Sequence, residues 1–180
     1  MKKTVALFMA LVMSLALAAC GSGGENPFDK VTEYGQKNFT FSNMVELFGE
    51  NYNETGGSEH YRYEYSDYDF YGYKGTLSLS FDRKEYKYYW ITGKSGYIDL
   101  SPEEAPFNDM EWKFDKGDLN KTQYEKVINT FIKKFDAEYG PNEPSEYGYH
   151  WKDKSGYTYY LSYYDDHQGF GIGVLKWNVY

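Results

Sequence analysis

The chain has 180 residues, of which 19 are basic and 27 acidic, so its formal net charge is −8. This length suits one compact domain with its own core. The negative charge argues against nucleic-acid binding, which needs a basic face, and against peripheral attraction to anionic lipid. Aromatic residues make up 21% of the chain, with 22 tyrosines, which predicts tyrosine-rich β-strands.

The first 19 residues have the pattern of a secretory leader. A basic start at Met1-Lys2-Lys3 is followed by an apolar run from Thr4 to Ala19. A membrane-spanning helix needs about 20 apolar residues, and this run is shorter. The sequence therefore predicts a signal peptide over residues 1–19 that is removed on export.

The end of this leader reads Leu17-Ala18-Ala19-Cys20 and resembles the lipobox of bacterial lipoproteins. The resemblance implies that the Cys20 thiol takes a diacylglyceryl group and that cleavage leaves Cys20 as the new N-terminus. Two acyl chains anchor a protein stably. The expected location is the outer face of the cytoplasmic membrane or the outer membrane of a bacterium. The competing interpretation is an ordinary secreted protein, but Cys20 is the only cysteine, so no intramolecular disulfide accounts for it.

The segment after Cys20 has the composition of a linker. Residues 20–37 are rich in Gly, Ser and Asn, include Pro27 and show little periodicity, which predicts a flexible lipidated tether. We expect a single folded domain over residues 38–180. Without the leader lysines, 17 basic and 27 acidic residues remain, a net charge of −10 that favours the solubility of a surface domain.

A short helix and a run of strands are expected first in this domain. Asn43 can cap a helix over about 43–48, with Glu46 three residues later and Gly49 placed to end it. Apolar and polar residues then alternate in three runs, which predicts half-buried strands. These runs are Tyr61-x-Tyr63-x-Tyr65, Leu77-x-Leu79-x-Phe81 and Tyr86-x-Tyr88-x-Trp90. Further strands are expected over 96–100 and 110–114, with a surface loop over 102–108.

The clearest predicted element is a long amphipathic helix over about 123–139. Thr122 and Glu125 have capping-box spacing, and Gly140-Pro141 can end the helix. Seven apolar residues follow helical spacing along one face, so the helix should pack on a sheet. They are Tyr124, Val127, Ile128, Phe131, Ile132, Phe135 and Tyr139. Strands are expected again over 147–151, 157–164 and 170–179.

Two halves of the domain share short sequence patterns. Phe48-Gly49 and Tyr139-Gly140 end the two helices, and Leu79-Ser80 and Leu161-Ser162 lie in later strands. We therefore expect an α+β fold with an antiparallel sheet, both helices on one face, and possible repeats of a helix followed by three strands. A competing sequence match implies a different offset between the two halves. It joins Lys94-Ser95-Gly96-Tyr97 to Lys154-Ser155-Gly156-Tyr157.

The aromatic-Gly helix ends and the helix-then-strands order resemble the tandem α/β repeats of β-lactamase-inhibitor-protein-like domains. That family is common among small bacterial envelope lipoproteins. The resemblance implies protein binding or assembly across an open aromatic sheet, not catalysis, and it names no particular partner. The first helix of this chain is shorter than the family pattern.

The chain contains no motif that indicates an active site or a metal site. Of its three histidines, only His167 lies among other ligand types, in Asp165-Asp166-His167, and we interpret that run as a solvated turn. Residues 115–120 lack the length of an EF-hand loop and are interpreted as a turn before the helix cap. Ser95 and Ser155 lie in Lys-Ser-Gly turns without a nucleophile elbow. We expect no metal, no cofactor and no enzymatic activity.

Three glycines at period two, Gly169, Gly171 and Gly173, leave bare backbone along one strand face. Glycine weakens a strand unless another group must approach closely. The favoured interpretation is that the long helix lies against this face. The alternative is a flat strip where a partner or ligand docks.

The leading functional hypothesis is a non-enzymatic, lipid-anchored binding module for a protein or peptide. Tyrosine contributes large contact area at interfaces, so exposed aromatic residues of the strands are the first candidates for the binding surface. They are Tyr61, Tyr63, Tyr65, Tyr71, Tyr73, Tyr157, Tyr159 and Trp151. A glycan-binding module is the alternative and predicts an exposed Trp90, Trp151 or Trp177. An envelope enzyme is the third hypothesis and predicts a deep cleft that contains a histidine.

Overall fold

A computed structural model of the chain describes residues 26–89, 91–164 and 169–176. The described residues form three helices: α2 (Pro27–Tyr34), α3 (Phe41–Phe48) and α4 (Lys121–Tyr139). Six described strands precede α4. They are β1 (Asn53–Glu54), β2 (His60–Phe70), β3 (Tyr73–Asp82), β4 (Lys84–Tyr89), β5 (Lys94–Asp99) and β6 (Phe107–Asp115). Four strands follow α4: β7 (Glu143–Ser145), β8 (Gly148–Lys152), β9 (Tyr157–Tyr163) and β10 (Gly169–Lys176).

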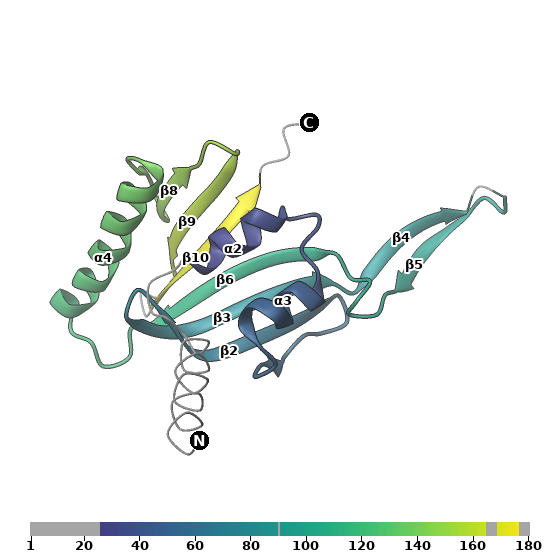
Figure 1. Cartoon of the computed structure of the whole chain (residues 1–180), viewed down its shortest axis with the longest axis horizontal. Helices are drawn as coiled ribbons and strands as arrows, with labels where there is room; N and C mark the ends of the chain where they lie inside the picture. Colours follow the sequence, from purple (N-terminus) through teal and green to yellow (C-terminus); the bar gives the residue numbers. More distant parts are fainter. Residues whose placement is uncertain (1–25, 90, 165–168, 177–180) are drawn as a thin grey trace, which may run out of the picture.

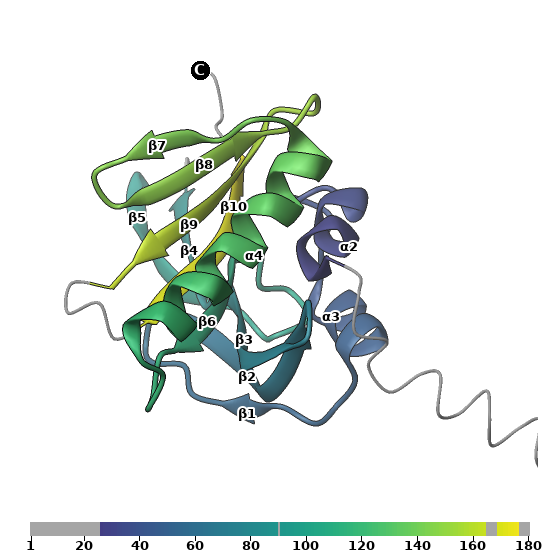
Figure 2. The same cartoon turned by 90° about the vertical axis from the view of Figure 1, so that its left-hand side faces the viewer.

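Eight strands form one antiparallel sheet in the order β1-β2-β3-β6-β10-β9-β8-β7. Strands β4 and β5 pair only with each other and form a hairpin that extends away from the main sheet (Figure 1). Figure 2 shows α4 against the strands of the second half, with α2 and α3 on the same side of the sheet. The expected α+β class, with an antiparallel sheet and the helices on one face, is confirmed.

The sheet order shows that the two halves repeat. Read from each edge toward the centre, the first half gives β1, β2, β3 and β6, and the second gives β7, β8, β9 and β10. Each half has a helix, α3 or α4, followed by four sheet strands, one more than the sequence pattern predicts. Helix α2 precedes the first half, and the β4–β5 hairpin is inserted in it. Leu79-Ser80 and Leu161-Ser162 lie in the corresponding strands β3 and β9. The competing sequence match pairs the inserted β5 with the turn before β9, so it does not correspond to the structural repeat.

Both expected helices start earlier than the sequence pattern predicts. The N-cap of α3 is Thr40, and Asn43 is the third helical residue of its capping box. The N-cap of α4 is Asn120, whose side chain accepts from the Gln123 amide, rather than Thr122. In each case a side chain with the same capping chemistry lies slightly earlier in the chain. Gly49 and Gly140 end the helices with φ of 85° and 96°, a left-handed region that glycine adopts without strain.

Helix α2 corrects the expected tether over residues 20–37, because the folded unit already includes Asn26. Asn26 caps the helix by accepting from the Phe28 amide, and Pro27 occupies its first turn. Phe28 and Val31, one turn apart, are buried against the rest of the core. Their burial outweighs a local composition that is typical of linkers. The segment from Cys20 to Glu25, and the whole leader, lie outside the described residues.

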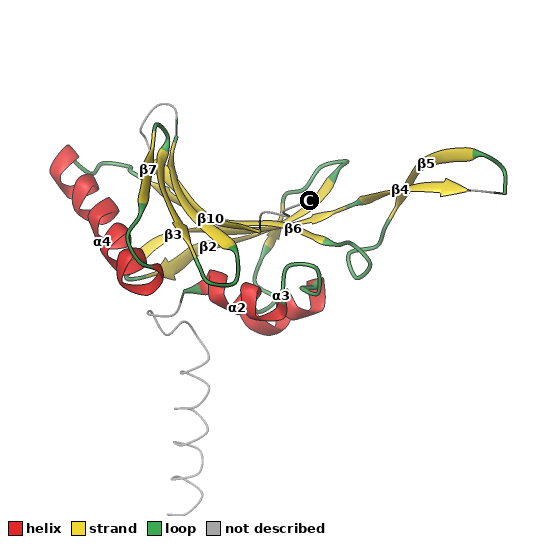
Figure 3. Cartoon of the chain, turned by 90° about the horizontal axis from the view of Figure 1, so that it is seen from above, coloured by secondary structure: helices red, strands yellow, loops and turns green. Residues whose placement is uncertain are grey.

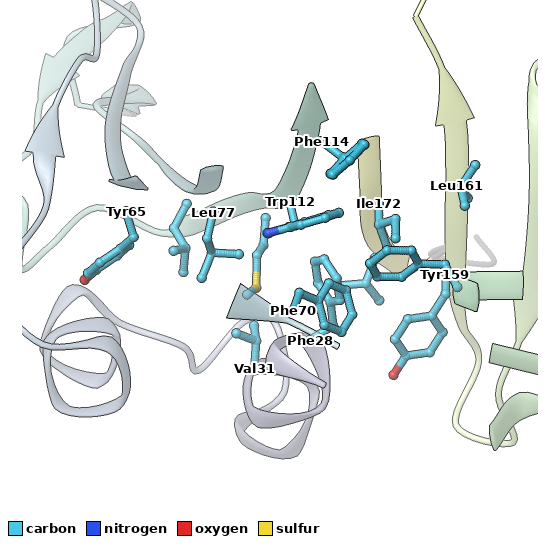
Figure 4. Close-up of a cluster of buried hydrophobic side chains, with 14 of the residues drawn as sticks. Phe28, Val31, Tyr65, Phe70, Leu77, Trp112, Phe114, Tyr159, Leu161 and Ile172 are labelled. Atoms are coloured by element: carbon cyan, nitrogen blue, oxygen red, sulfur yellow. The ribbon is translucent and has the colours of Figure 1, made fainter. Parts of the chain in front are cut away.

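The core lies between the helices and one face of the sheet, and it is mostly aromatic (Figure 4). Trp112, from the central strand β6, is completely buried and contacts the rings of Phe70 and Phe131 at 5.4 and 5.1 Å between centroids. Offset and edge-to-face contacts of this kind add to the hydrophobic burial. Within residues 26–89, 91–164 and 169–176, no helix has the length and apolar character needed to cross a membrane.

Candidate binding face

The two faces of the main sheet have different compositions. Two neighbouring rows of paired residues cross the same six strands, and alternate residues of a strand point to opposite faces. The row on the helix side is Tyr65, Leu77, Trp112, Ile172, Leu161 and Tyr149. The next row is Glu64, Ser78, Glu111, Gly173, Tyr160 and His150. We call the side of the second row the open face, because no described helix covers it. The sheet bends so that the helices lie on its outer side (Figure 3).

The three glycines of β10 belong to this open face. Phe170, Ile172 and Val174, which alternate with them, are buried on the helix side, so the expectation that the long helix lies against the glycines is wrong. A methyl group at Gly171 would meet the Glu111 carboxylate, and one at Gly173 would meet the Tyr160 hydroxyl. The glycine strip therefore lets long side chains from β6 and β9 lie across the bare backbone. It is covered by the chain's own side chains rather than being flat.

Two carboxyl groups occupy the centre of the open face. Burial raises the pKa of Asp109 and of Glu111, although Arg62 and Lys113 act in the opposite direction on both groups. The Lys113 ammonium lies 3.4 Å from Glu111, and the Glu111 side chain is 23% exposed. Loss of hydration thus outweighs the nearby cations. In this environment, the two adjacent carboxylates would be stabilised by binding a further cation or hydrogen-bond donor from outside the chain.

Phenol and hydroxyl groups surround these carboxyls. Burial, followed by the negative potential of Asp109 and Glu111, raises the pKa of Tyr160, and burial with Glu111 raises that of Tyr164. Both phenols therefore remain protonated and can donate. The hydroxyl oxygens of Ser78 and Tyr164 are buried without a hydrogen-bond partner in the described part of the chain. Buried polar atoms normally find a partner, so this face contains unused hydrogen-bonding capacity beside its carboxylates.

The aromatic residues expected to form the binding surface belong mainly to the core. Five of the eight are at most 6% exposed: Tyr63, Tyr65, Tyr157, Tyr159 and Trp151. Tyr61, Tyr71 and Tyr73 are half-buried, and their hydroxyls bond to the Leu100 carbonyl, Glu138 and Thr130. The expectation of an exposed tyrosine surface at these positions is wrong, because these side chains pack into or against the core on the helix side of the sheet. The burial of Trp151 also removes one of the tryptophans expected on a glycan platform. Trp90 and Trp177 lie outside the described residues.

The open-face residues of β6, which are now the candidates instead of the tyrosines, were not predicted. The sequence nevertheless contains a signal for them. In Asp109-Met110-Glu111-Trp112-Lys113-Phe114, charged and apolar residues alternate strictly. This pattern predicts a strand with one buried and one polar face. The three glycines at period two mark the same face from the neighbouring strand.

A second polar cluster lies on the helix side, where α2 meets α4. Tyr139 and Tyr159 donate hydrogen bonds to Asp29 at 2.7 and 3.0 Å, and Tyr71 donates to Glu138 at 3.1 Å. Burial, and then Asp29, raises the pKa of Glu138 to about 7. Asp29, Tyr71 and Glu138 border an open hollow of about 750 Å³. These hydrogen bonds hold α2 against α4 and the sheet, so we interpret the cluster as structural.

The expected turn at residues 115–120 is confirmed. The Gly117 amide donates to Asp115 at 2.9 Å, and the turn runs into the Asn120 cap. In the part of the chain that the structure describes, no group of three or more His, Cys, Asp and Glu residues is arranged to hold a metal ion. Asp165, Asp166 and His167 lie outside that part, as does Cys20. His60 is exposed, and its Nδ1 lies 3.0 Å from Asp82.

Comparisons of the chain with protein-family models, with curated protein sequences and with solved structures find no match.

Proposed function

We propose that this chain is an exported, lipid-anchored binding module that holds a protein or peptide partner on the open face of its sheet. Lipid on Cys20 would anchor the module, as the likeness of Leu17-Ala18-Ala19-Cys20 to a lipobox suggests. The likeness to β-lactamase-inhibitor-protein-like repeats supports a role in binding rather than catalysis. A binding partner is inferred from the residues of the open face.

One observation carries this proposal: two half-buried carboxyls, Asp109 and Glu111, lie together on the open face, and burial raises the pKa of each. Keeping such groups is unfavourable for the isolated fold, and unfavourable surface features commonly serve function. A lysine or arginine side chain from a partner would offset the lost hydration through charge-assisted hydrogen bonds. The phenols of Tyr160 and Tyr164 can donate to acceptors around that cation. The module is therefore expected to prefer partners with a basic segment.

The anchor is tested by intact mass and membrane partition of the full chain expressed in a bacterial host. The expected product lacks residues 1–19, carries lipid mass on Cys20 and sediments with membranes, because two acyl chains bind a bilayer stably. A Cys20→Ser variant should lose both the lipid mass and the sedimentation. An unmodified, freely soluble wild-type product would overturn the anchored localisation and leave the binding face untouched.

The binding face is tested by photo-cross-linking in the same cells. A photoreactive amino acid replaces Thr76, which is half-buried on the open face, or Lys133, which is exposed on the outer side of α4. The Thr76 position should give a discrete cross-linked band that disappears when Asp109→Asn and Glu111→Gln are added. A band of equal strength from Lys133, or one that survives the double substitution, would contradict the assignment of the open face.

A further inference from the structure

The β4–β5 hairpin gathers most of the exposed apolar side chains of the molecule. In the described part of the chain, seven large hydrophobic side chains are clearly exposed, and five of them lie between residues 86 and 97. They are Tyr86, Tyr88, Tyr89, Ile91 and Tyr97. Ile91, at the turn, is 100% exposed. Figures 1 and 3 show the hairpin reaching away from the rest of the fold.

Nothing in the described fold accounts for the apolar character of this hairpin. Its strands pair only with each other, and an isolated two-stranded hairpin is marginally stable in water. The Tyr86 and Tyr97 rings meet at 5.3 Å, but these side chains remain 58% and 70% exposed. Large exposed apolar patches mark sites of association.

The distribution of these groups around the hairpin identifies what can cover them. Tyr86, Tyr88 and Tyr97 share one face by register, whereas Tyr89 and Ile98 lie on the other, and Ile91 occupies the end. A folded partner would cover one face of such a thin element. A lipid interface surrounds a protruding tip on every side, and it is the environment in which tyrosine and tryptophan concentrate.

The charges and the backbone of the tip suit the same environment. Residues 86–98 contain Lys87 and Lys94 and no acidic residue, so this segment is cationic in a chain of net negative charge. Lysine stems can lie along apolar surface with the ammonium at the headgroups. Lys87 also lies 3.1 Å from Glu85, at the end of the hairpin nearer the body. The amides of Thr92 and Gly93 donate to the Tyr89 carbonyl at 3.1 and 2.9 Å, so the turn enters the interface with these donors satisfied.

We propose that the tip of the β4–β5 hairpin inserts into the headgroup region of an anionic lipid membrane, as a contact separate from any lipid on Cys20. Six paired residues extend about 20 Å, which exceeds the depth of the headgroup layer. The negative net charge disfavours membrane contact by the body but not by this segment. The insertion would fix the orientation of the module, and hence of its open face, relative to the bilayer.

The test uses a chain that begins at Ser22, so that neither the leader nor Cys20 binds lipid. All buried core residues of the described chain lie between Phe28 and Val174, so this shortened chain keeps the whole packed unit. Its sedimentation is measured with vesicles of phosphatidylcholine and phosphatidylglycerol at a ratio of about 7:3 and with pure phosphatidylcholine vesicles, because anionic headgroups attract lysines. Circular dichroism confirms the fold of each variant.

The wild-type chain should sediment with the anionic vesicles. Ile91→Ser should lower the partition coefficient about tenfold, since one large apolar side chain loses its burial. Tyr147→Ser is the matched control, because Tyr147 is 65% exposed but lies at the other end of the sheet, and it should bind like wild type. No sedimentation of the wild-type chain, or equal losses in the Ile91 and Tyr147 variants, would overturn the proposal. Ile91→Ser could instead keep its vesicle binding while substitutions in the hairpin abolish a complex with another protein. That result would overturn the proposal in favour of a protein partner.

Discussion

The two faces of the sheet are made by the same strands but have opposite character. On the helix side, Leu77, Trp112 and Ile172 are buried with almost no exposed surface. One residue along each strand, the open face has Ser78, Glu111 and Gly173. The comparison shows that stability and binding can be divided between alternate residues of one strand. The helix side holds the fold together, and the open face keeps groups that the fold alone does not need.

The most destabilising substitution should be one on the helix side of the sheet. Phe131, on α4, is completely buried against Phe70, Trp112 and Phe170. Phe131→Ala leaves a cavity and should lower the free energy of unfolding by about 3–5 kcal/mol. Urea unfolding monitored by circular dichroism measures this loss. A change below about 1 kcal/mol would mean that α4 does not pack on the sheet as described.

Two glycine substitutions compare the faces directly. A methyl group at Gly75 would meet the Lys113 carbonyl and the Trp112 ring, neither of which can move easily. Gly75→Ala should therefore destabilise the protein by about 2 kcal/mol. The three atoms nearest to a methyl group at Gly171 belong to the flexible Glu111 side chain, so Gly171→Ala should cost less than about 1 kcal/mol. Equal melting temperatures for the two variants would contradict the different packing of the faces.

One carboxyl on the helix side should make stability depend on pH. The pKa of Glu138 is raised to about 7 in the fold by burial and by Asp29, so the folded state binds this proton more tightly than the unfolded chain. Its contribution is present below about pH 4.5 and is lost as pH rises toward 7. Because the Glu138 side chain is only partly buried, solvent screening reduces the effect to about 1 kcal/mol.

Urea unfolding at both ends of this pH window tests the effect. Glu138→Gln should remove about 1 kcal/mol of the loss seen in the wild-type protein. Glu125→Gln is the matched control, since Glu125 is also on α4 and is exposed beside Lys121. It should leave the pH dependence unchanged, and identical profiles for the wild type and Glu138→Gln would refute the prediction.

One pair of substitutions on the open face should slightly stabilise the fold. Burial raises the pKa of Asp109 and Glu111, so their ionised forms are unfavourable in the isolated fold at neutral pH. Combined Asp109→Asn and Glu111→Gln should raise the free energy of unfolding by about 0.5–1 kcal/mol. Glu64→Gln, further along the same face, should change it less. A clear loss of stability in the double variant would show that the carboxylates serve the fold rather than a partner.

The sequence predicted the class of the fold because its periodicities are strong. The stripe from Tyr124 to Tyr139 and the alternation in β2, β3 and β6 identify elements without any tertiary information. It did not predict α2, because an Asn-Pro start and two apolar residues are too few to outweigh a linker-like composition. Burial of Phe28 and Val31 depends on distant strands, which local patterns do not describe.

The candidate site was harder to predict than the fold. Alternation shows that Tyr63 and Tyr65 share a face, but it does not show which face the helices cover. Tyrosine suits both a core and an exposed surface, so its abundance favoured the wrong side of the sheet. The acidic residues of β6 alternate as clearly as the tyrosines. Their importance depends on the glycines of β10, which the fold brings beside them.

Equilibrium peptide binding tests most directly whether the open face binds a basic segment. Peptides are selected from a random displayed library on the chain that begins at Ser22, and their affinities for the wild type and the Asp109→Asn, Glu111→Gln variant are compared at a temperature where both are folded. The selected peptides should share a lysine or arginine and bind the double variant at least about tenfold more weakly. Peptides without a basic residue, or equal affinity for the two proteins, would contradict this assignment of the open face.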